Sequence, residues 1–247
     1  EVVFIAKVGD DLFGREAKAL FAKENICTDY VLTDPSEPSG VALIMVDAKG
    51  ENCIAVASGA NGTLMPEDIE GLEGVIAQSD LLLMQLETPL ETVRYAADVA
   101  VNLGVPVILN PAPACELPSD LYDCLEVITP NESEAELLTN IKVTDEASAE
   151  AAARVLCDKG VLNVVITMGA KGAYVFDGED GVMVPAFKVE AVDTTAAGDV
   201  FNGALAVALT EELELEEAVR FASKAASISV TRMGAQASAP RREELVG

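Results

Sequence analysis

Apolar runs and amphipathic stretches alternate along most of the chain. Short apolar runs, typical of buried strands, lie at residues 81–86, 105–110, 126–129 and 163–167. Stretches with apolar residues three or four positions apart precede them and predict helices near residues 66–78, 89–102, 119–124, 132–139 and 145–158. Strands that alternate with helices form a mostly parallel sheet sandwiched by helices. We therefore expect an α/β fold that binds its ligands at the carboxyl ends of the strands.

The two ends of the chain add elements outside this alternation. The apolar run at residues 2–6 predicts a strand that ends near residues 8–10, and a helix is expected from about Asp11 to Glu24. The apolar residues of that helix fall on one stripe: Leu12, Phe13, Ala17, Leu20 and Phe21. The remaining elements are a hairpin at residues 173–176 and 182–185, a helix at residues 216–231 and a polar tail at residues 240–247.

Residues 39–57 have a different pattern. Two apolar runs, at residues 40–46 and 52–56, flank the polar, glycine-containing segment 47–51. Because no helix lies between the runs, they predict an antiparallel β-hairpin. On pattern alone this hairpin could form an edge of the main sheet. We divide the chain into an α/β domain, residues 1–38 and 58–247, and this hairpin at residues 39–57.

The composition excludes several classes of protein. Half of the 247 residues are apolar, but no apolar run approaches the length of a membrane span without glycine or charge. The net charge of −26, from 16 basic and 42 acidic residues, disfavours nucleic acid as a partner, because phosphates need basic contacts. The absence of histidine excludes a histidine-based catalytic triad.

The cysteines indicate a reducing compartment. They are scattered, odd in number and contain no C-x-x-C pair: Cys27, Cys53, Cys115, Cys124 and Cys157. Such a pattern favours free, mostly packing thiols. The first residues also lack the basic region, apolar stretch and cleavage site of a secretion signal. We therefore expect a cytoplasmic protein that does not contact a membrane.

The segment at residues 193–204, Asp-Thr-Thr-Ala-Ala-Gly-Asp-Val-Phe-Asn-Gly-Ala, predicts a turn that leads directly into a buried helix. The small residues Ala196, Ala197 and Gly198 leave backbone N–H groups uncovered, and a helix N-terminus with free N–H groups binds anions. Asp199 falls in the first turn of the helix. It either only stabilises the helix start, or acts as a general base beside a phosphoryl group.

Further polar residues follow the predicted strands at their carboxyl ends and so indicate one site. Each also has an ordinary structural explanation. Asn131 and Glu134 have the spacing of a helix capping box, Gly169 and Gly172 have that of a simple turn, and Glu87 has the position of a solvated charge after a strand. The remaining strand is followed by residues 110–113. No G-x-x-x-x-G-K-[ST] motif is present, which excludes a P-loop kinase.

Together these motifs resemble those of the ribokinase (PfkB) family of sugar kinases. Residues 193–199 are similar to its D-T-x-G-A-G-D signature, with Ala196 in place of the first glycine, and residues 84–87, 129–134, 166–172 and 230–236 also match. The resemblance implies a ribokinase-like fold in which residues 39–57 contribute to a lid over the sugar, and lids pair in a homodimer. It implies transfer of the γ-phosphoryl group of ATP to O5 of D-ribose, giving ribose 5-phosphate.

The resemblance also implies the role of each site residue. Asp199 would be the base and a sugar ligand, Glu87 a second sugar ligand, and the N–H groups of Ala196, Ala197 and Gly198 an anion hole. Mg²⁺ would be held through water by Glu134. The ATP site would comprise Asn131, Thr167, Gly169, Ala170, Lys171, Gly172, Gly198 and Ser223. A monovalent cation, K⁺, would be bound, mostly by carbonyl groups, at Asp193, Thr195, Ser229, Arg232, Gly234 and Ser238.

Two departures from the family leave alternatives open. Ser223 stands where relatives carry His or Asn beside the adenine. Family members also begin with a strand carrying sugar-binding Asn and Asp, followed by a Gly-Gly-Lys-Gly-type segment; neither is found here, so we expect a fragment. The alternatives are another PfkB-type kinase, for fructose, a 2-keto-3-deoxy sugar acid or a nucleoside, and a non-catalytic nucleotide-binding protein.

Overall fold

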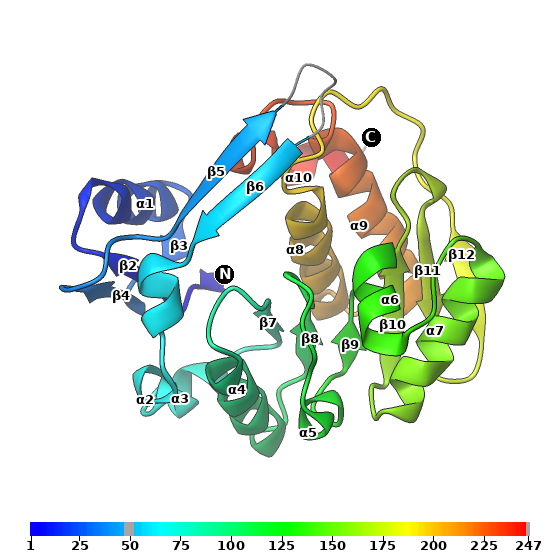
Figure 1. The fold of residues 1–247 in the computed structure, drawn as a ribbon, viewed down its shortest axis with the longest axis horizontal. Helices are drawn as coiled ribbons and strands as arrows, with labels where there is room; N and C mark the ends of the chain where they lie inside the picture. Colours follow the sequence, from blue (N-terminus) through cyan, green and yellow to red (C-terminus); the bar gives the residue numbers. More distant parts are fainter. Residues whose placement is uncertain (47–51, 246–247) are drawn as a thin grey trace. The chain divides into compact units, whose positions relative to one another are not determined.

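A computed structural model describes residues 1–46 and 52–245 (Figure 1). The chain divides into two compact units. The first, which we call the small unit, contains Glu1–Gly71 and Leu86–Ala96. The second, the sheet unit, contains Leu72–Gln85 and Ala97–Gly247.

The sheet unit is built on a six-stranded sheet with the strand order β12-β11-β10-β9-β8-β7. Strands β7 to β10 pair in parallel, and β10, β11 and β12 pair antiparallel. The predicted mostly parallel sheet and its terminal hairpin are therefore confirmed. The strands are β7 Leu82–Met84, β8 Val107–Leu109, β9 Val127–Ile128, β10 Asn163–Thr167, β11 Ala173–Phe176 and β12 Gly181–Val184.

Helices cover both faces of this sheet (Figure 1). Helices α8 (Ala197–Thr210) and α9 (Leu215–Ser229) pack on one face, where Leu205 and Val219 share an apolar core with Val165 of β10. Helix α7 (Glu146–Asp158) packs on β10 and β11, with Arg154 4.8 Å above the ring of Phe176. Phe176 follows Val175, which belongs to the α8–α9 core, and successive strand residues point to opposite faces. Helix α7 therefore covers the other face.

Shorter helices complete the sheet unit. Helix α4 (Leu90–Asn102) continues from the small unit into it. The others are α3 Glu73–Ile76, α5 Ser119–Tyr122, α6 Glu132–Thr139, α10 Arg242–Leu245 and the 3₁₀ turns η2 Gly169–Lys171 and η3 Gln236–Ser238. The C-terminal residues, expected to form a polar tail, thus contain α10.

Within its described residues, the small unit has three two-stranded sheets. Strands β1 (Val2–Val3) and β3 (Ile26–Cys27) pair in parallel, as do β2 (Ala6–Gly9) and β4 (Val31–Asp34). Strands β5 and β6 form the predicted antiparallel hairpin, and among the described residues it pairs with no other strand, so it is not an edge of the main sheet. Its turn, residues 47–51, lies outside the described residues. The other elements are α1 Leu12–Lys23, β5 Val41–Val46, β6 Asn52–Ala57, η1 Gly59–Thr63 and α2 Pro66–Ile69.

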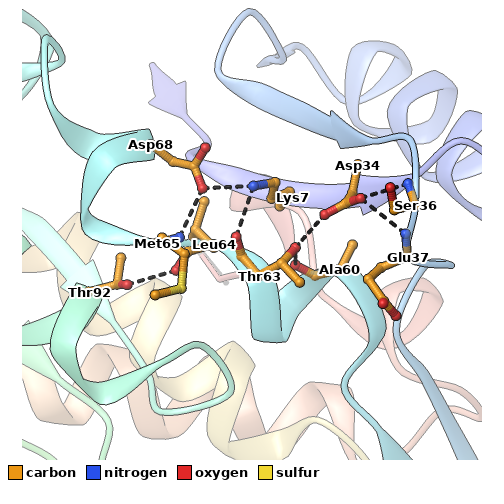
Figure 2. A network of polar contacts seen from close by, with 10 residues as sticks. All are labelled: Lys7, Asp34, Ser36, Glu37, Ala60, Thr63, Leu64, Met65, Asp68 and Thr92. Carbon is orange, nitrogen blue, oxygen red and sulfur yellow. Dashed lines mark hydrogen bonds and ion pairs between the residues drawn. The ribbon is translucent and has the colours of Figure 1, made fainter.

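A polar network joins the elements of the small unit (Figure 2). Lys7 of β2 donates from Nζ to Asp68 of α2 and to the carbonyl of Thr63, both at 2.8 Å. The Thr63 hydroxyl donates at 2.6 Å to Asp34, which also accepts the N–H groups of Ser36 and Glu37. These three bonds to the carboxylate lower the pKa of Asp34 to about 2.

Two element predictions were wrong in detail. The run at residues 2–6 is split, because Phe4 still bonds to Cys27 whereas Ala6 bonds to Tyr30, so that the chain changes its pairing partner between β1 and β2. The helix predicted at residues 66–78 is two short helices, since Gly71 has φ +86°, which no α-helix accommodates. The helix predicted from about Asp11 to Glu24 is confirmed as α1, and on its apolar stripe Leu12 and Phe13 are 59% and 60% exposed.

Candidate active site

Helix α8 begins at the turn in which the catalytic residues were predicted. Among the described residues, the N–H groups of Gly198 and Asp199 have no acceptor, whereas that of Ala197 donates to Thr194 at a long 3.3 Å. Ala196 precedes the helix at φ +58°, a left-handed conformation that costs a non-glycine residue about 1–2 kcal/mol. This is the position at which the family signature has glycine. The turn therefore presents unused donors at the positive end of α8.

Asp199 lies on the first turn of α8 and is exposed. In the described part of the chain, its carboxylate has no hydrogen-bond or ion-pair partner. An acid in the first turn stabilises the helix dipole without a hydrogen bond, so this role leaves the carboxylate oxygens unoccupied. Asp199 is therefore available to accept a proton or a hydroxyl group from a ligand.

Asp193 ties the turn before α8 to a distant loop. Its carboxylate accepts the N–H group of Thr195 and that of Gly234, each at 2.9 Å. The Thr195 side chain, followed by the N–H groups of Gly234 and Thr195, lowers the pKa of Asp193. The N–H groups of Val192 and Asp193 both donate to the carbonyl of Val230, at 2.7 and 3.1 Å. Segments about forty residues apart, both assigned to the cation site, are thus brought together.

The other residues assigned to the cation site lie in or beside the same loop. Ser229 and Ser238 are buried, and their hydroxyls already donate to the carbonyls of Ala226 and Ala235, at 2.9 and 2.7 Å. Arg232 forms an ion pair with Glu244. These side chains therefore already have partners within the protein. The backbone carbonyl oxygens are the groups that remain as ligands for a cation.

Asn131 and Glu134 form a complete capping box at the start of α6. The Asn131 side chain accepts the N–H groups of Ser133 and Glu134, both at 2.9 Å. In return, Glu134 accepts the backbone N–H of Asn131 at 2.8 Å and its side-chain amide at 2.7 Å. Burial raises the pKa of Glu134, and the bond from the Asn131 N–H opposes that rise. The structural explanation of this pair is correct, and each carboxylate oxygen of Glu134 already accepts one hydrogen bond from Asn131.

The predicted nucleotide loop lies beside this capping box. Thr167, at the end of β10, donates its N–H to Pro130 at 2.9 Å and bridges to Asn131. The turn η2, which contains Gly169, Ala170 and Lys171, follows. Lys171 is ion-paired with Glu132 at 2.9 Å. Gly172 closes the loop at φ +111°, where a Cβ atom would lie 2.0 Å from the carbonyl oxygen of Val184.

The two remaining predicted site residues, Ser223 and Glu87, lie on other elements than those described above. Ser223 is half-buried on α9, and no described residue hydrogen-bonds to its hydroxyl. Glu87 follows β7 and belongs to the small unit.

The sequence interpretation assigned no role to two buried polar residues, Thr129 and Asn202. The Thr129 hydroxyl donates to the Asn202 side chain at 2.6 Å, and the Asn202 amide donates to the Gly198 carbonyl at 2.9 Å. The available signal was an asparagine inside an apolar helix, four residues after Gly198. Its partner, 73 residues away, has no such signal.

Two further features of the described residues concern metals and membranes. No group of three or more His, Cys, Asp or Glu side chains is arranged to hold a metal ion there. None of the helices within those residues has the length and apolar character that a bilayer span requires.

Comparison with known proteins defines the class. The pfkB family of carbohydrate kinases matches residues 1–242. A ribokinase of Haemophilus influenzae is 49% identical over 244 residues, which are 99% of this chain and 80% of that protein. A deoxyribokinase of Salmonella typhi is 40% identical over 245 residues, with the same coverage of 99% and 80%.

The solved structures agree with the sequence matches. The structure of Arabidopsis thaliana ribokinase complexed with ribose and ATP is similar to this chain, with a TM-score of 0.93 and 31% identity over 99% of this chain and 80% of that one. The fold is thus that of a ribokinase-like α/β phosphotransferase. The chain belongs to the pfkB family of carbohydrate kinases.

Proposed function

We propose that this protein is an ATP-dependent kinase that phosphorylates O5 of D-ribose, giving ribose 5-phosphate and ADP. The observation that carries the proposal is an unpartnered Asp199 carboxylate beside unused N–H donors at the start of α8. Its similarity to a ribokinase at 49% identity, and to a ribokinase structure that contains ribose and ATP, supports the choice of substrates.

In this mechanism Asp199 accepts the proton of the O5 hydroxyl while O5 forms a bond to the γ-phosphorus. The bond between that phosphorus and the bridging oxygen breaks, and ADP leaves with the electron pair. The N–H groups of the Ala196–Gly198 turn, together with that of Asp199, stabilise the transferred phosphoryl group. Phosphoryl transfer depends mainly on such positioning and on neutralisation of charge.

The nucleotide would lie along the carboxyl end of the sheet. Asn131, Thr167 and the loop from Gly169 to Gly172 would contact its phosphates and adenosine. Lys171 would reach the nucleotide only if it left its ion pair with Glu132. The free hydroxyl of Ser223 would face the adenine, and Glu87 would bind a sugar hydroxyl.

Two cations would support the reaction. Mg²⁺ would neutralise charge on the ATP phosphates; Glu134 fits a role through water, because both of its oxygens are already bonded to Asn131. K⁺ would lie between the turn before α8 and the loop that contains Gly234, which Asp193 joins. Its ligands would be carbonyl groups of Asp193, Thr195, Ser229, Arg232, Gly234 and Ser238.

We also propose that residues 39–57 act as a lid and that lids pair in a homodimer. The base of the hairpin is held firmly: Asp11, which caps α1, accepts the N–H and hydroxyl of Ser39 at 2.8 and 2.7 Å. Above this base, Leu43 and Val56 are exposed on opposite faces of the hairpin.

We also propose a cytoplasmic location. The four described cysteine side chains are free thiols, which is compatible with that location.

A second candidate acceptor is deoxyribose. The deoxyribokinase of Salmonella typhi is 40% identical to this chain over 99% of its length. Both sugars have an O5 hydroxyl, so the chemistry at Asp199 would be the same. Relative kcat/KM values for ribose, deoxyribose and fructose decide between the candidates.

The test of the proposed function is replacement of the base. Asp199→Asn should lower kcat by about 100-fold or more, because the proton acceptor is lost, while the affinity for ATP stays within about twofold. Asp177→Asn, at an exposed carboxylate in the β11–β12 turn, is the matched control and should leave kcat unchanged. Undiminished turnover in Asp199→Asn would exclude Asp199 as the base.

A further inference from the structure

A chain of two hydrogen bonds, the first buried and the second partly buried, runs from the sheet to the start of α8. Thr129 directly follows β9, and its N–H donates to Leu109 at 3.0 Å, which fixes its backbone to the neighbouring strand. Its hydroxyl donates to Oδ1 of Asn202 at 2.6 Å, and Nδ2 of Asn202 donates to the carbonyl oxygen of Gly198 at 2.9 Å. Thr129 and Asn202 are only 1% and 4% exposed.

Among the described residues, no other side-chain hydrogen bond links this part of α8 to the sheet. Phe201 and Leu205 pack in the core against the sheet. Apolar contacts hold the helix to the sheet, but they are not directional and so define its position along its own axis poorly. Hydrogen bonds have strict distance and angle requirements. The Thr129–Asn202 pair is therefore the contact that sets where the first turn of α8 lies relative to the end of β9.

The two ends of this bond chain carry the two halves of the proposed reaction. Gly198 immediately precedes Asp199, and Thr129 lies two residues before Asn131. We infer that the Thr129–Asn202 pair is a positioning device that fixes Asp199 and its anion-binding turn relative to the nucleotide-binding residues that follow β9. This inference rests on the proposed kinase function. Neither residue touches substrate; both act through the backbone of Gly198.

Positioning should affect the rate more than binding. In-line transfer requires the acceptor oxygen, the phosphorus and the leaving oxygen to be aligned, and a displacement near 1 Å is enough to slow such a step strongly. Apart from the γ-phosphoryl group, which faces the turn at Gly198, the proposed contacts of ATP do not depend on the first turn of α8, and the sugar contacts the Asp199 side, so each substrate would keep most of its binding contacts. Loss of the pair should therefore lower kcat and leave both KM values within about threefold.

The first variant is Thr129→Val, which has nearly the same shape as threonine but leaves Oδ1 of Asn202 buried without a donor. We expect a lower Tm and a fall in kcat of about 10- to 100-fold. Thr129→Ser retains the hydroxyl and should keep kcat within about threefold of wild type. Thr139→Val is a control at the C-terminal end of α6, where the Thr139 hydroxyl donates to the carbonyl of Ala135. It should lower Tm without changing kcat.

The double variant Thr129→Val/Asn202→Leu separates positioning from stability. Replacing both polar partners by apolar groups of similar size removes the unpaired buried atom, so that Tm should return toward that of wild type. A kcat that stays low in this stable protein supports the inference. A kcat that recovers together with Tm would show that the pair only stabilises the fold, and would overturn it.

Hydrogen–deuterium exchange tests the inference independently of turnover. The amides of Val200 to Asn202 should exchange faster in Thr129→Val and in the double variant, because the first turn of α8 is no longer held. Unchanged exchange there would overturn the inference, whether or not the protein is a kinase. An inactive wild-type protein would overturn the proposed function but not the exchange result. If the protein phosphorylates a different sugar, kcat for that sugar can be compared among the variants in the same way.

Discussion

At the scale of single residues, Asp34 makes the stability of the folded protein depend on pH. Its carboxylate accepts three hydrogen bonds, which lower its pKa to about 2, whereas an unfolded aspartate has a pKa near 3.9. A group with a lower pKa in the folded state stabilises the protein above its unfolded pKa and loses that contribution as the pH falls. The contribution of Asp34 should therefore disappear between about pH 4 and pH 2.

This predicts a pH-dependent effect of Asp34→Asn. The variant should melt at a lower temperature than wild type at pH 6, and the difference in Tm should narrow between pH 4 and pH 2, where wild-type Asp34 becomes protonated. Asp158→Asn, at the exposed end of α7, controls for the loss of one negative charge. A difference in Tm that stays constant from pH 6 to pH 2 would contradict the prediction.

Single residues were predictable from the sequence where their chemistry depends on local spacing. Asp199 was placed correctly in the first turn of a helix, and the capping box that was the structural alternative for Asn131 and Glu134 is confirmed, because both patterns depend on contacts within four residues. The Thr129–Asn202 bond was not predictable, since its partners are 73 residues apart and meet only in the folded sheet unit. The positive φ of Ala196 was likewise hidden, because alanine rarely adopts it.

At the scale of elements, α6 and α7 provide a matched comparison. Both begin with a capping box, formed by Asn131 with Glu134 and by Asp145 with Ser148. Loss of either cap should cost about 1 kcal/mol, or about 2–4 °C in Tm. If Asn131 also contacts the nucleotide, Asn131→Ala should in addition lower kcat/KM for ATP by about 10- to 100-fold.

Asp145→Ala is the control for this prediction, because its cap is geometrically similar and it has no assigned role in the site. It should lower Tm by a similar amount and leave the kinetics of the reaction unchanged. Equal kinetic effects of the two variants would mean that Asn131 is only a helix cap. Measurements of Tm and of initial rates over a range of ATP concentrations are sufficient.

The elements were predicted well where a hydrophobic period continued over a whole helix or strand. Strand β10, for example, has the bounds that its apolar run indicated. The errors have local physical causes. Gly71 interrupts a helical pattern by its backbone conformation, and the first strand changes partner between Phe4 and Ala6. The apolar stripe of α1 has the period of a core helix, yet Leu12 and Phe13 are exposed, because periodicity does not report what packs against a face.

At the scale of the whole molecule, charge and apolar exposure have opposite effects. The net charge of −26 makes two copies repel each other. The hairpin β5–β6 exposes Leu43 and Val56, 65% and 62% exposed, on its two faces. Exposed apolar side chains on both faces of a two-stranded sheet are costly in water and favour burial against a partner. The proposed homodimer therefore has an apolar contact that stabilises it and a charge that opposes it.

This opposition predicts that salt strengthens the dimer. At about 0.05 M salt the screening length is well above 10 Å, and it falls to about 4 Å at 0.5 M, which removes most of the repulsion between distant charges. The apolar contact is not screened. The dimer dissociation constant, measured by sedimentation equilibrium, should therefore fall as salt is raised.

Substitutions in the hairpin test the apolar contact directly. Leu43→Asp or Val56→Asp should yield a monomer at every salt concentration. Leu162→Asp, at a side chain 58% exposed elsewhere in the chain, adds the same charge and should remain dimeric. A dimer that weakens with salt, or that survives both hairpin substitutions, would show that the association does not depend on this hairpin.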